Sequence, residues 1–221
     1  MNYKIISDEE KLWEFINWLP QLEENEKYFV SLFARKKYCN YLIKSNDKTQ
    51  LKRFTAKRED LFHKIKQLEC EVGAYRIKDN IAPQESLVLY INPNPRNMIR
   101  ATFTLMKKLV NIMETKASGY NIHAEALSSI QNSKSKSHFC DFDIDTKDID
   151  LTKMHDILPK EAYDIIETRG GYHILVKTRI ASDNQWYLKI TNTFHVDQAG
   201  DQFVPVPGCV QGGFVPKFII N

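Results

Sequence analysis

The sequence lacks the residue patterns that build disulfide frameworks, zinc knuckles and membrane spans. Its four cysteines are far apart and form no Cys-x-x-Cys pair, which excludes the usual zinc and disulfide patterns and indicates reduced thiols. No run approaches the roughly 18 apolar residues of a membrane-spanning helix, and the charged N-terminus has no apolar signal core. We therefore expect a cytoplasmic protein with no membrane partner.

Proline and glycine are also scarce, at eight each in 221 residues. With 43% hydrophobic and 27% charged residues, the chain has the composition of an ordinary globular protein. Its net charge of +3 is too small to indicate a nucleic-acid partner by itself. The distribution of charge is more informative, because cations gather in the first half and carboxylates crowd residues 141–164.

Hydrophobic spacing and turn residues predict an α+β fold with a substantially antiparallel sheet. A capping-box pattern at Ser7 and Glu10 indicates the start of the first helix. Helices are expected at about residues 8–18, 55–71, 98–115 and 151–158. Strands are expected at 28–33, 86–92 and 140–145, with a hairpin of 165–168 and 172–177, while 186–194 suits either a helix or a strand.

Two prolines, Pro93 and Pro95, are expected to end the strand at Asn92 and to leave Arg96 in a loop. This turn has two interpretations. Asn92 and Arg96 contact a template or a triphosphate, or they form an ordinary Asn-Pro turn with a solvated arginine. The polar stretch 131–137 then marks a boundary between an N-terminal α/β unit, residues 1–130, and a second unit, residues 131–221.

The most informative segment alternates three carboxylates with two apolar residues, as Asp141-Phe142-Asp143-Ile144-Asp145. Every second side chain of a strand lies on the same face, about 7 Å apart. One face therefore gathers the carboxylates, while Phe142 and Ile144 pack into a core. Because Mg²⁺ and Mn²⁺ prefer oxygen ligands, the pattern predicts a metal site. An exposed acidic strand without a ligand is the alternative.

Three short segments with Asp, His and Gly follow one another along the chain, and their order is informative. Asp141-Phe142-Asp143 comes first, then Gly171-Tyr172-His173, then Val196-Asp197 shortly before Pro207-Gly208. This set resembles the archaeo-eukaryotic primase superfamily. In that family an Asp-x-Asp strand, a small-x-His strand and a hydrophobic-Asp motif build the palm of primases and primase-polymerases. The order and spacing of the motifs carry the resemblance, which covers residues 141–208.

The resemblance implies a primase palm, with an RRM-like antiparallel sheet in residues 131–221 joined to the N-terminal unit as one catalytic domain. Asp141, Asp143 and Asp197 would be the catalytic carboxylates, holding two Mg²⁺ or Mn²⁺ ions about 4 Å apart. The pair on the strand stays open, because Asp143 with Asp145 fits the motif as well as Asp141 with Asp143, which we favour. Asp201 is a rival for the third position.

His173 matches the histidine that binds the incoming nucleotide in this family. Gly171 would let a phosphate approach the backbone, and Arg169 and Lys177 would neutralise it. The plainer interpretation of these residues is a tight glycine turn in a hairpin, with a structural histidine.

Cations in the first half are candidates for contacts with nucleic acid. Arg35, Lys36 and Lys37 stand beside Tyr38, a combination that suits backbone phosphate with a stacked base. Arg96 is a further candidate. A solvated basic surface is the default for such clusters.

The function implied by the resemblance is metal-dependent, template-directed nucleotidyl transfer by a DNA primase or primase-polymerase of phage or plasmid type. Its partners would be a single-stranded DNA template, nucleoside triphosphates and a helicase domain or separate helicase. The sequence itself has no Gly-x-x-x-x-Gly-Lys-Ser/Thr loop. Two alternatives stay open: an inactive nucleic-acid-binding module on the same fold, and a metal-dependent nuclease.

Overall fold

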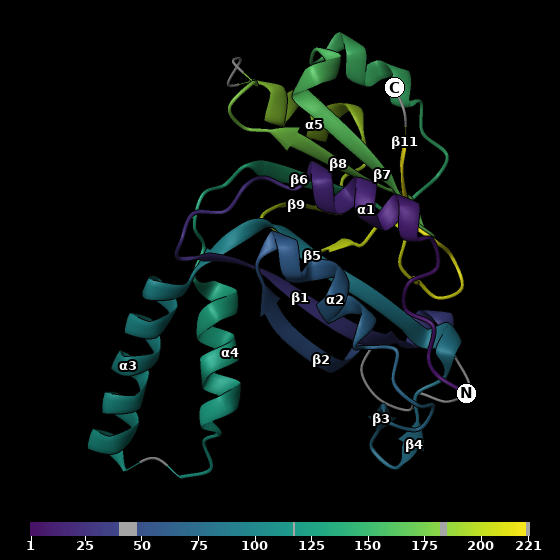
Figure 1. Ribbon diagram of the computed structural model, residues 1–221. Coiled ribbons are helices and arrows are strands. Elements are labelled where there is room, and N and C mark those ends of the chain that lie inside the picture. Colours follow the sequence, from purple (N-terminus) through teal and green to yellow (C-terminus); the bar gives the residue numbers. More distant parts are fainter. Residues whose placement is uncertain (40–47, 117, 182–184, 220–221) are drawn as a thin grey trace.

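Two antiparallel sheets form the body of the protein (Figure 1). The computed structural model describes residues 1–39, 48–116, 118–181 and 185–219. The first sheet has the order β10-β5-β1-β2, the second β11-β7-β8-β6-β9, and a separate ribbon pairs β3 with β4. The strands are β1 (Glu26–Arg35), β2 (Lys48–Ala56), β3 (Arg76–Ile77), β4 (Asn80–Ile81), β5 (Leu87–Asn97), β6 (Phe139–Ile144), β7 (Tyr163–Glu167), β8 (Tyr172–Lys177), β9 (Gln198–Gly200), β10 (Val204–Pro205) and β11 (Lys217–Ile219).

Five α-helices accompany the sheets in the described residues. They are α1 (Glu9–Trp18), α2 (Leu61–Lys66), α3 (Met98–Thr115), α4 (Ile122–Asn132) and α5 (Trp186–Thr193). The expected α+β class with antiparallel pairing is confirmed. None of the described helices has the length and apolarity to cross a membrane.

The larger core lies between the first sheet, α1 and α2. Alternation along β1 sends Tyr28, Val30 and Leu32 into this core, where they meet Leu12 and Phe15 of α1. The helix begins after Asp8, which caps it by accepting a hydrogen bond from the backbone N–H of Lys11. The first helix is therefore confirmed, with Asp8 rather than Ser7 as its cap.

The second sheet is covered on both faces. Phe142, Ile144, Ile174 and Val176 of its central strands pack in a second core with Ile190 of α5. The opposite face contributes Phe139, Ile166 and Leu175 to the larger core. Because Asp141 and Asp143 share the face of Phe139, the acidic residues look toward the first sheet.

The predicted helix at 55–71 is wrong at both ends, because only Leu61–Lys66 are α-helical. Thr55 and Ala56 belong to β2, which pairs with β1 along its whole length, and the helix is shortened to α2. Phe54 and Thr55 have the aromatic and β-branched side chains that favour strands. The apolar stripe itself was placed correctly, because Leu61 and Ile65 are buried in the core.

The expectation that Pro93 and Pro95 end a strand is also wrong, since β5 continues to Asn97. The two prolines lie where the pairing with β1 shifts register, between the pairs Phe29 with Asn92 and Lys27 with Arg96. A proline can be tolerated at such an irregularity, because its missing N–H is not needed by the ladder there. As a consequence, Arg96 lies on a strand and not in a loop.

Helices α3 and α4 form a hairpin that extends away from the sheets (Figure 1). The helix at 98–115 is confirmed as α3, whereas α4 was not predicted. The expected polar connection at 131–137 shrinks to the residues after Asn132. Its Lys134 forms a β-bridge with Arg96.

The predicted boundary near residue 130 is crossed by the first sheet. Residues after it supply all strands of the second sheet, but β10 pairs with β5 at Val204 with Ile91 and Pro205 with Tyr90. The turn that follows reaches the N-terminal segment, where the Gly208 carbonyl accepts from the N–H groups of Ser7 and Asp8. A strand of the second unit therefore belongs to the sheet of the first, and backbone hydrogen bonds join the two units.

Candidate functional site

A cleft of about 1200 Å³ has walls from both large sheets. Carboxylates and a histidine come from the second sheet, and cations and aromatic rings come from the first. The carboxylate wall has Asp143, Asp145, His173 and Asp197. The cationic wall has Phe33, Arg35, Lys37, Lys48, Gln50 and Tyr90. The structure therefore brings together residues that are up to 164 positions apart, from Phe33 to Asp197.

The three predicted motifs meet on adjacent strands. Asp143 of β6 is opposite His173 of β8 and, on its other side, opposite Gln198 of β9. The backbone N–H of Asp197 donates to the Asp143 carbonyl oxygen at 2.9 Å. Asp145 follows directly after the end of β6 and also reaches the cleft. This pairing places the third aspartate beside the first two motifs.

His173 is held by Asp141. Its Nδ1 lies 2.9 and 3.1 Å from the two Asp141 carboxylate oxygens, and the Asp141 residue is only 1% exposed. The other ring nitrogen, Nε2, lies 3.5 Å from Asp143 Oδ1. Asp141 is thus engaged with the imidazole behind the cleft, while Asp143 is partly open to it.

Burial and charge act together on these groups. Burial raises the pKa of Asp143, aided by the negative charges of Asp141, Asp145 and Asp197 and opposed by His173. Burial works to lower the pKa of His173, but the charge of Asp141 and its hydrogen bond outweigh it, so that pKa is raised. The carboxylate wall of the cleft therefore concentrates negative charge that His173 balances only in part.

The donor set of the cleft suits a hard divalent cation in its chemistry. Asp143, Asp145 and Asp197 offer carboxylate oxygens, the ligands that Mg²⁺ and Mn²⁺ prefer. Within the described part of the chain, no group of three or more His, Cys, Asp or Glu side chains is arranged closely enough to hold a metal ion. The carboxylates face one cleft without forming a closed ligand cage.

Two residues predicted around the nucleotide, Arg169 and Lys177, are engaged elsewhere. Arg169 stacks over the Tyr38 ring at 4.6 Å and donates to the Gly212 carbonyl. Lys177, at the far end of β8 from His173, forms an ion pair with Asp164 at 2.9 Å.

Gly171 has a packing role at the start of β8. A Cβ there would lie 1.8 Å from the Ile144 carbonyl oxygen. Its neighbour Gly170 lines the cleft beside Asp145.

The cationic wall is built at the paired ends of β1 and β2, where Arg35 is opposite Lys48. The Arg35 Nη1 donates to the Tyr90 hydroxyl at 3.0 Å. Lys37 lines the cleft, and Lys36 is exposed next to it. Two of the three predicted cations therefore face the carboxylates across the cleft.

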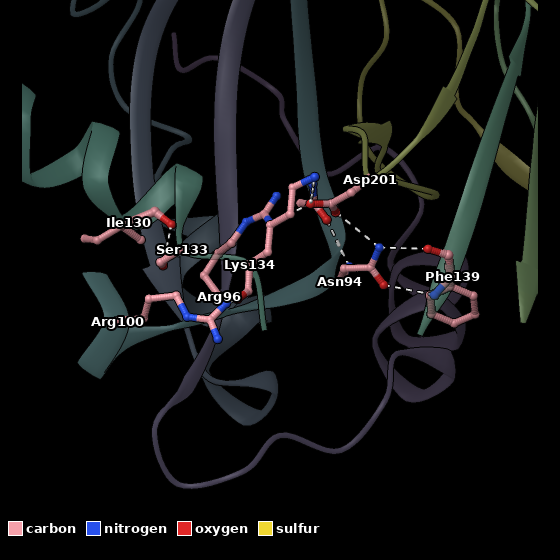
Figure 2. Close-up of polar contacts among 9 residues, drawn as sticks. Asn94, Arg96, Arg100, Ile130, Ser133, Lys134, Phe139 and Asp201 are labelled. Carbon is pink, nitrogen blue, oxygen red and sulfur yellow. Dashed lines mark hydrogen bonds and ion pairs between the residues drawn. The ribbon is translucent and has the colours of Figure 1, made fainter. Parts of the chain in front are cut away.

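Arg96 is engaged in a buried ion pair (Figure 2). Its Nη1 lies 2.7 Å from an Asp201 oxygen, and the two side chains are 3% and 8% exposed. Asn94 donates to the same carboxylate at 3.1 Å and pairs with both backbone groups of Phe139. Of the two interpretations of this turn, the solvated arginine is therefore wrong, because Arg96 is buried against Asp201. Asp201 in turn forms a contact between β5 and the segment after β9.

Sequence reasoning missed the aromatic part of the cleft. Phe33 and Tyr90 lie within apolar runs and have the pattern of core residues. Their rings meet edge to face with centroids 5.8 Å apart. The available signal was alternation: Phe33 and Arg35 share one face of β1, so a cation on that face indicates that the ring beside it is near solvent.

The comparisons with known proteins leave the residues of the cleft as the basis for assigning a function. No protein-family model, curated protein or solved structure matches the chain.

Proposed function

We propose that the protein is a metal-dependent nucleotidyltransferase that makes primers from nucleoside triphosphates on a single-stranded DNA template, as a DNA primase or primase-polymerase. One observation carries the proposal. Asp143, His173 and Asp197, from three separate motifs, lie in one cleft and face the cations Arg35 and Lys37. Carboxylates on one wall can bind divalent cations, and cationic side chains on the other can bind polyphosphate. This arrangement suits a reaction that brings the two together.

Each part of the cleft has a distinct role in the proposed reaction. Asp143, Asp145 and Asp197 do not form a ligand cage by themselves, so they would offer oxygen ligands to Mg²⁺ or Mn²⁺ together with the phosphates of the nucleotide. The ion would supply charge stabilisation at the transferring phosphoryl group. This assignment takes the second of the two strand pairs left open by the motif. Asp141 is then the positioning residue that fixes the His173 ring, because both of its oxygens contact Nδ1.

His173 directs its Nε2 toward Asp143 and the cleft. A ring fixed at Nδ1 can donate from Nε2 to a phosphate oxygen, as a charge-assisted hydrogen bond. Lys37 and Lys48 on the opposite wall would neutralise phosphates of the nucleotide or of the template. The partly exposed Phe33 ring would support a base.

The test is primer synthesis without a pre-existing primer. The protein is incubated with single-stranded DNA, labelled nucleoside triphosphates and Mg²⁺ or Mn²⁺, beside the variants Asp143→Asn and Asp156→Asn. Asp156 is an exposed aspartate outside the cleft and serves as the matched control. We expect short products from the wild type and from Asp156→Asn, and none from Asp143→Asn.

Two other results would overturn the proposal. Shortening of the DNA without triphosphates, abolished by Asp143→Asn, would identify a nuclease. Strand binding that is indifferent to divalent cations, with no synthesis, would identify a binding module.

A further inference from the structure

Helix α3 exposes a row of apolar side chains that has no partner within the described residues. Ile99, Phe103, Met106, Val110 and Met113 are between 49% and 75% exposed. We call these five residues the α3 stripe. The side of α3 toward α4 carries a different set of apolar residues, Ala101, Leu105, Leu109 and Ile112, which are buried or half-buried. The stripe is therefore additional to the packing of the hairpin.

The spacing of the stripe identifies the shape of what covers it. Successive members are separated by four, three, four and three residues, the 3.5-residue repeat of a seam between two packed helices. A flat sheet or a loop requires no such repeat. The helix has 18 residues, and at 1.5 Å per residue it offers a seam of about 27 Å. Exposed apolar rows of this kind mark interaction sites.

Charge beside the stripe indicates the chemistry of the partner. Arg100 and Lys107, one heptad apart, are exposed along its edge. With Ile99 and Phe103 they line a groove of about 430 Å³. A covering helix would place its flanking residues next to these cations, where carboxylates are favoured. A second copy of α3 would offer them only one carboxylate, Glu114.

We propose that the α3 stripe docks an amphipathic helix of another protein, whose apolar seam is flanked by acidic residues. The hairpin extends away from the two sheets (Figure 1). None of the five stripe residues lines the cleft, so a helix can cover the stripe without filling the cleft. The proposal goes beyond the nucleotidyl transfer proposed above and holds whether or not that activity is found.

The experiment measures binding of a defined helical peptide to the full chain by fluorescence anisotropy. The probe has about three heptads with Ile and Leu at the seam and Glu at the flanking positions. A second peptide has the same seam and Lys at the flanks. The protein variants are Met106→Glu, in the middle of the stripe, and Ile180→Glu, a matched control at an exposed apolar residue elsewhere.

We expect the acidic peptide to bind, Met106→Glu to weaken binding by about tenfold or more, and Ile180→Glu to leave it unchanged. Equal binding of the two peptides, or no effect of Met106→Glu, would overturn the proposal. Light scattering of the protein alone provides a further check. Self-association that Met106→Glu abolishes would show that a second copy occupies the stripe, and this would also overturn it.

Discussion

At the scale of single residues, a buried carboxylate and a histidine organise the cleft. Asp141 contacts His173 at 2.9 Å and lies behind the residues that line the cleft. One acidic strand therefore performs two tasks, positioning a ring with Asp141 and presenting oxygen atoms with Asp143. The two residues are on the same face of β6 but differ in exposure, with side chains 1% and 26% exposed.

Gly171 makes the tightest glycine approach in the turn before β8. In Gly171→Ala, the added Cβ would lie 1.8 Å from the Ile144 carbonyl oxygen, a backbone atom that moves only with β6. We expect a loss of about 1–3 kcal/mol or more in the free energy of unfolding, measured by urea denaturation. Gly170→Ala is the control, because its Cβ would make an ordinary 3.6 Å contact with Asp145. Equal losses in both variants would contradict this explanation.

Glu69 should make the free energy of unfolding depend on pH in the acidic range. Its Oε1 accepts from the backbone N–H groups of Ile5 and Ile6, and its Oε2 pairs with Lys66 at 2.8 Å. Partial burial works to raise the pKa of Glu69, but these three donors outweigh it and hold that pKa below its usual value.

Because the pKa of Glu69 is lowered on folding, its stabilising contribution is present above the pKa of the unfolded state. It is lost as the pH falls through the lower pKa of the folded state. Glu69→Gln keeps an acceptor oxygen and removes the charge. We expect it to lower stability by about 1 kcal/mol at neutral pH and to reduce the loss of stability in acid. Urea titrations at several pH values check this, with the exposed Glu59→Gln as control; parallel pH profiles for wild type and Glu69→Gln would refute it.

The side chains of the acidic strand show what a sequence can predict at this scale. Period-two alternation was enough to place Phe142 and Ile144 in a core and Asp143 on the opposite face. It could not reveal that Asp141 is buried against His173 or that Arg96 meets Asp201. Those contacts join residues 32 and 105 positions apart, and only the folded chain brings them together.

At the scale of elements, β5 connects the two sheets. The Asn94 side chain donates to the carbonyl and accepts from the N–H of Phe139, the first residue of β6. Asn94 and Arg96 both donate to the Asp201 carboxylate. Asn94 and Arg96 lie in the part of β5 where the pairing with β1 shifts register. The hydrophobic pattern located the strand correctly. The rule that prolines end strands placed its end too early, because the rule takes no account of irregularities in strand pairing.

The Arg96–Asp201 pair should matter far more than ion pairs on the surface. Asp201→Ala would leave the Arg96 guanidinium buried without its carboxylate, and we expect a loss of about 3–5 kcal/mol. The comparison is Glu125→Ala, which breaks the half-exposed pair with Lys108 and should cost about 0–1 kcal/mol. Thermal or urea unfolding measures both, and losses of similar size would refute the structural role of the buried pair.

At the scale of the whole molecule, the cleft depends on both sheets, with cations on one wall and carboxylates on the other. On the proposed function, Lys37 and Lys48 contact phosphates of a single strand. Lys37→Gln and Lys48→Gln should each reduce the slope of log affinity against log salt by about 0.7. Fluorescence anisotropy with a labelled oligonucleotide measures that slope.

The control for this salt dependence is Lys52→Gln. Lys52 lies on the same strand as Lys48 but lines a separate groove with Phe54 and Tyr75. We expect its slope to equal that of the wild type. A slope unchanged in all three variants would remove the cationic wall from strand binding.

The position of β10 has a consequence for how the chain folds during its synthesis. The edge of β5 stays uncovered at Tyr90 and Ile91 until Val204 and Pro205 have been made, more than a hundred residues later. Closing so long a loop is slow and carries an entropy cost that local contacts do not offset. The first sheet, although most of it is encoded early, is therefore completed only when nearly all of the described chain is available, and folding of the two sheets is coupled in time.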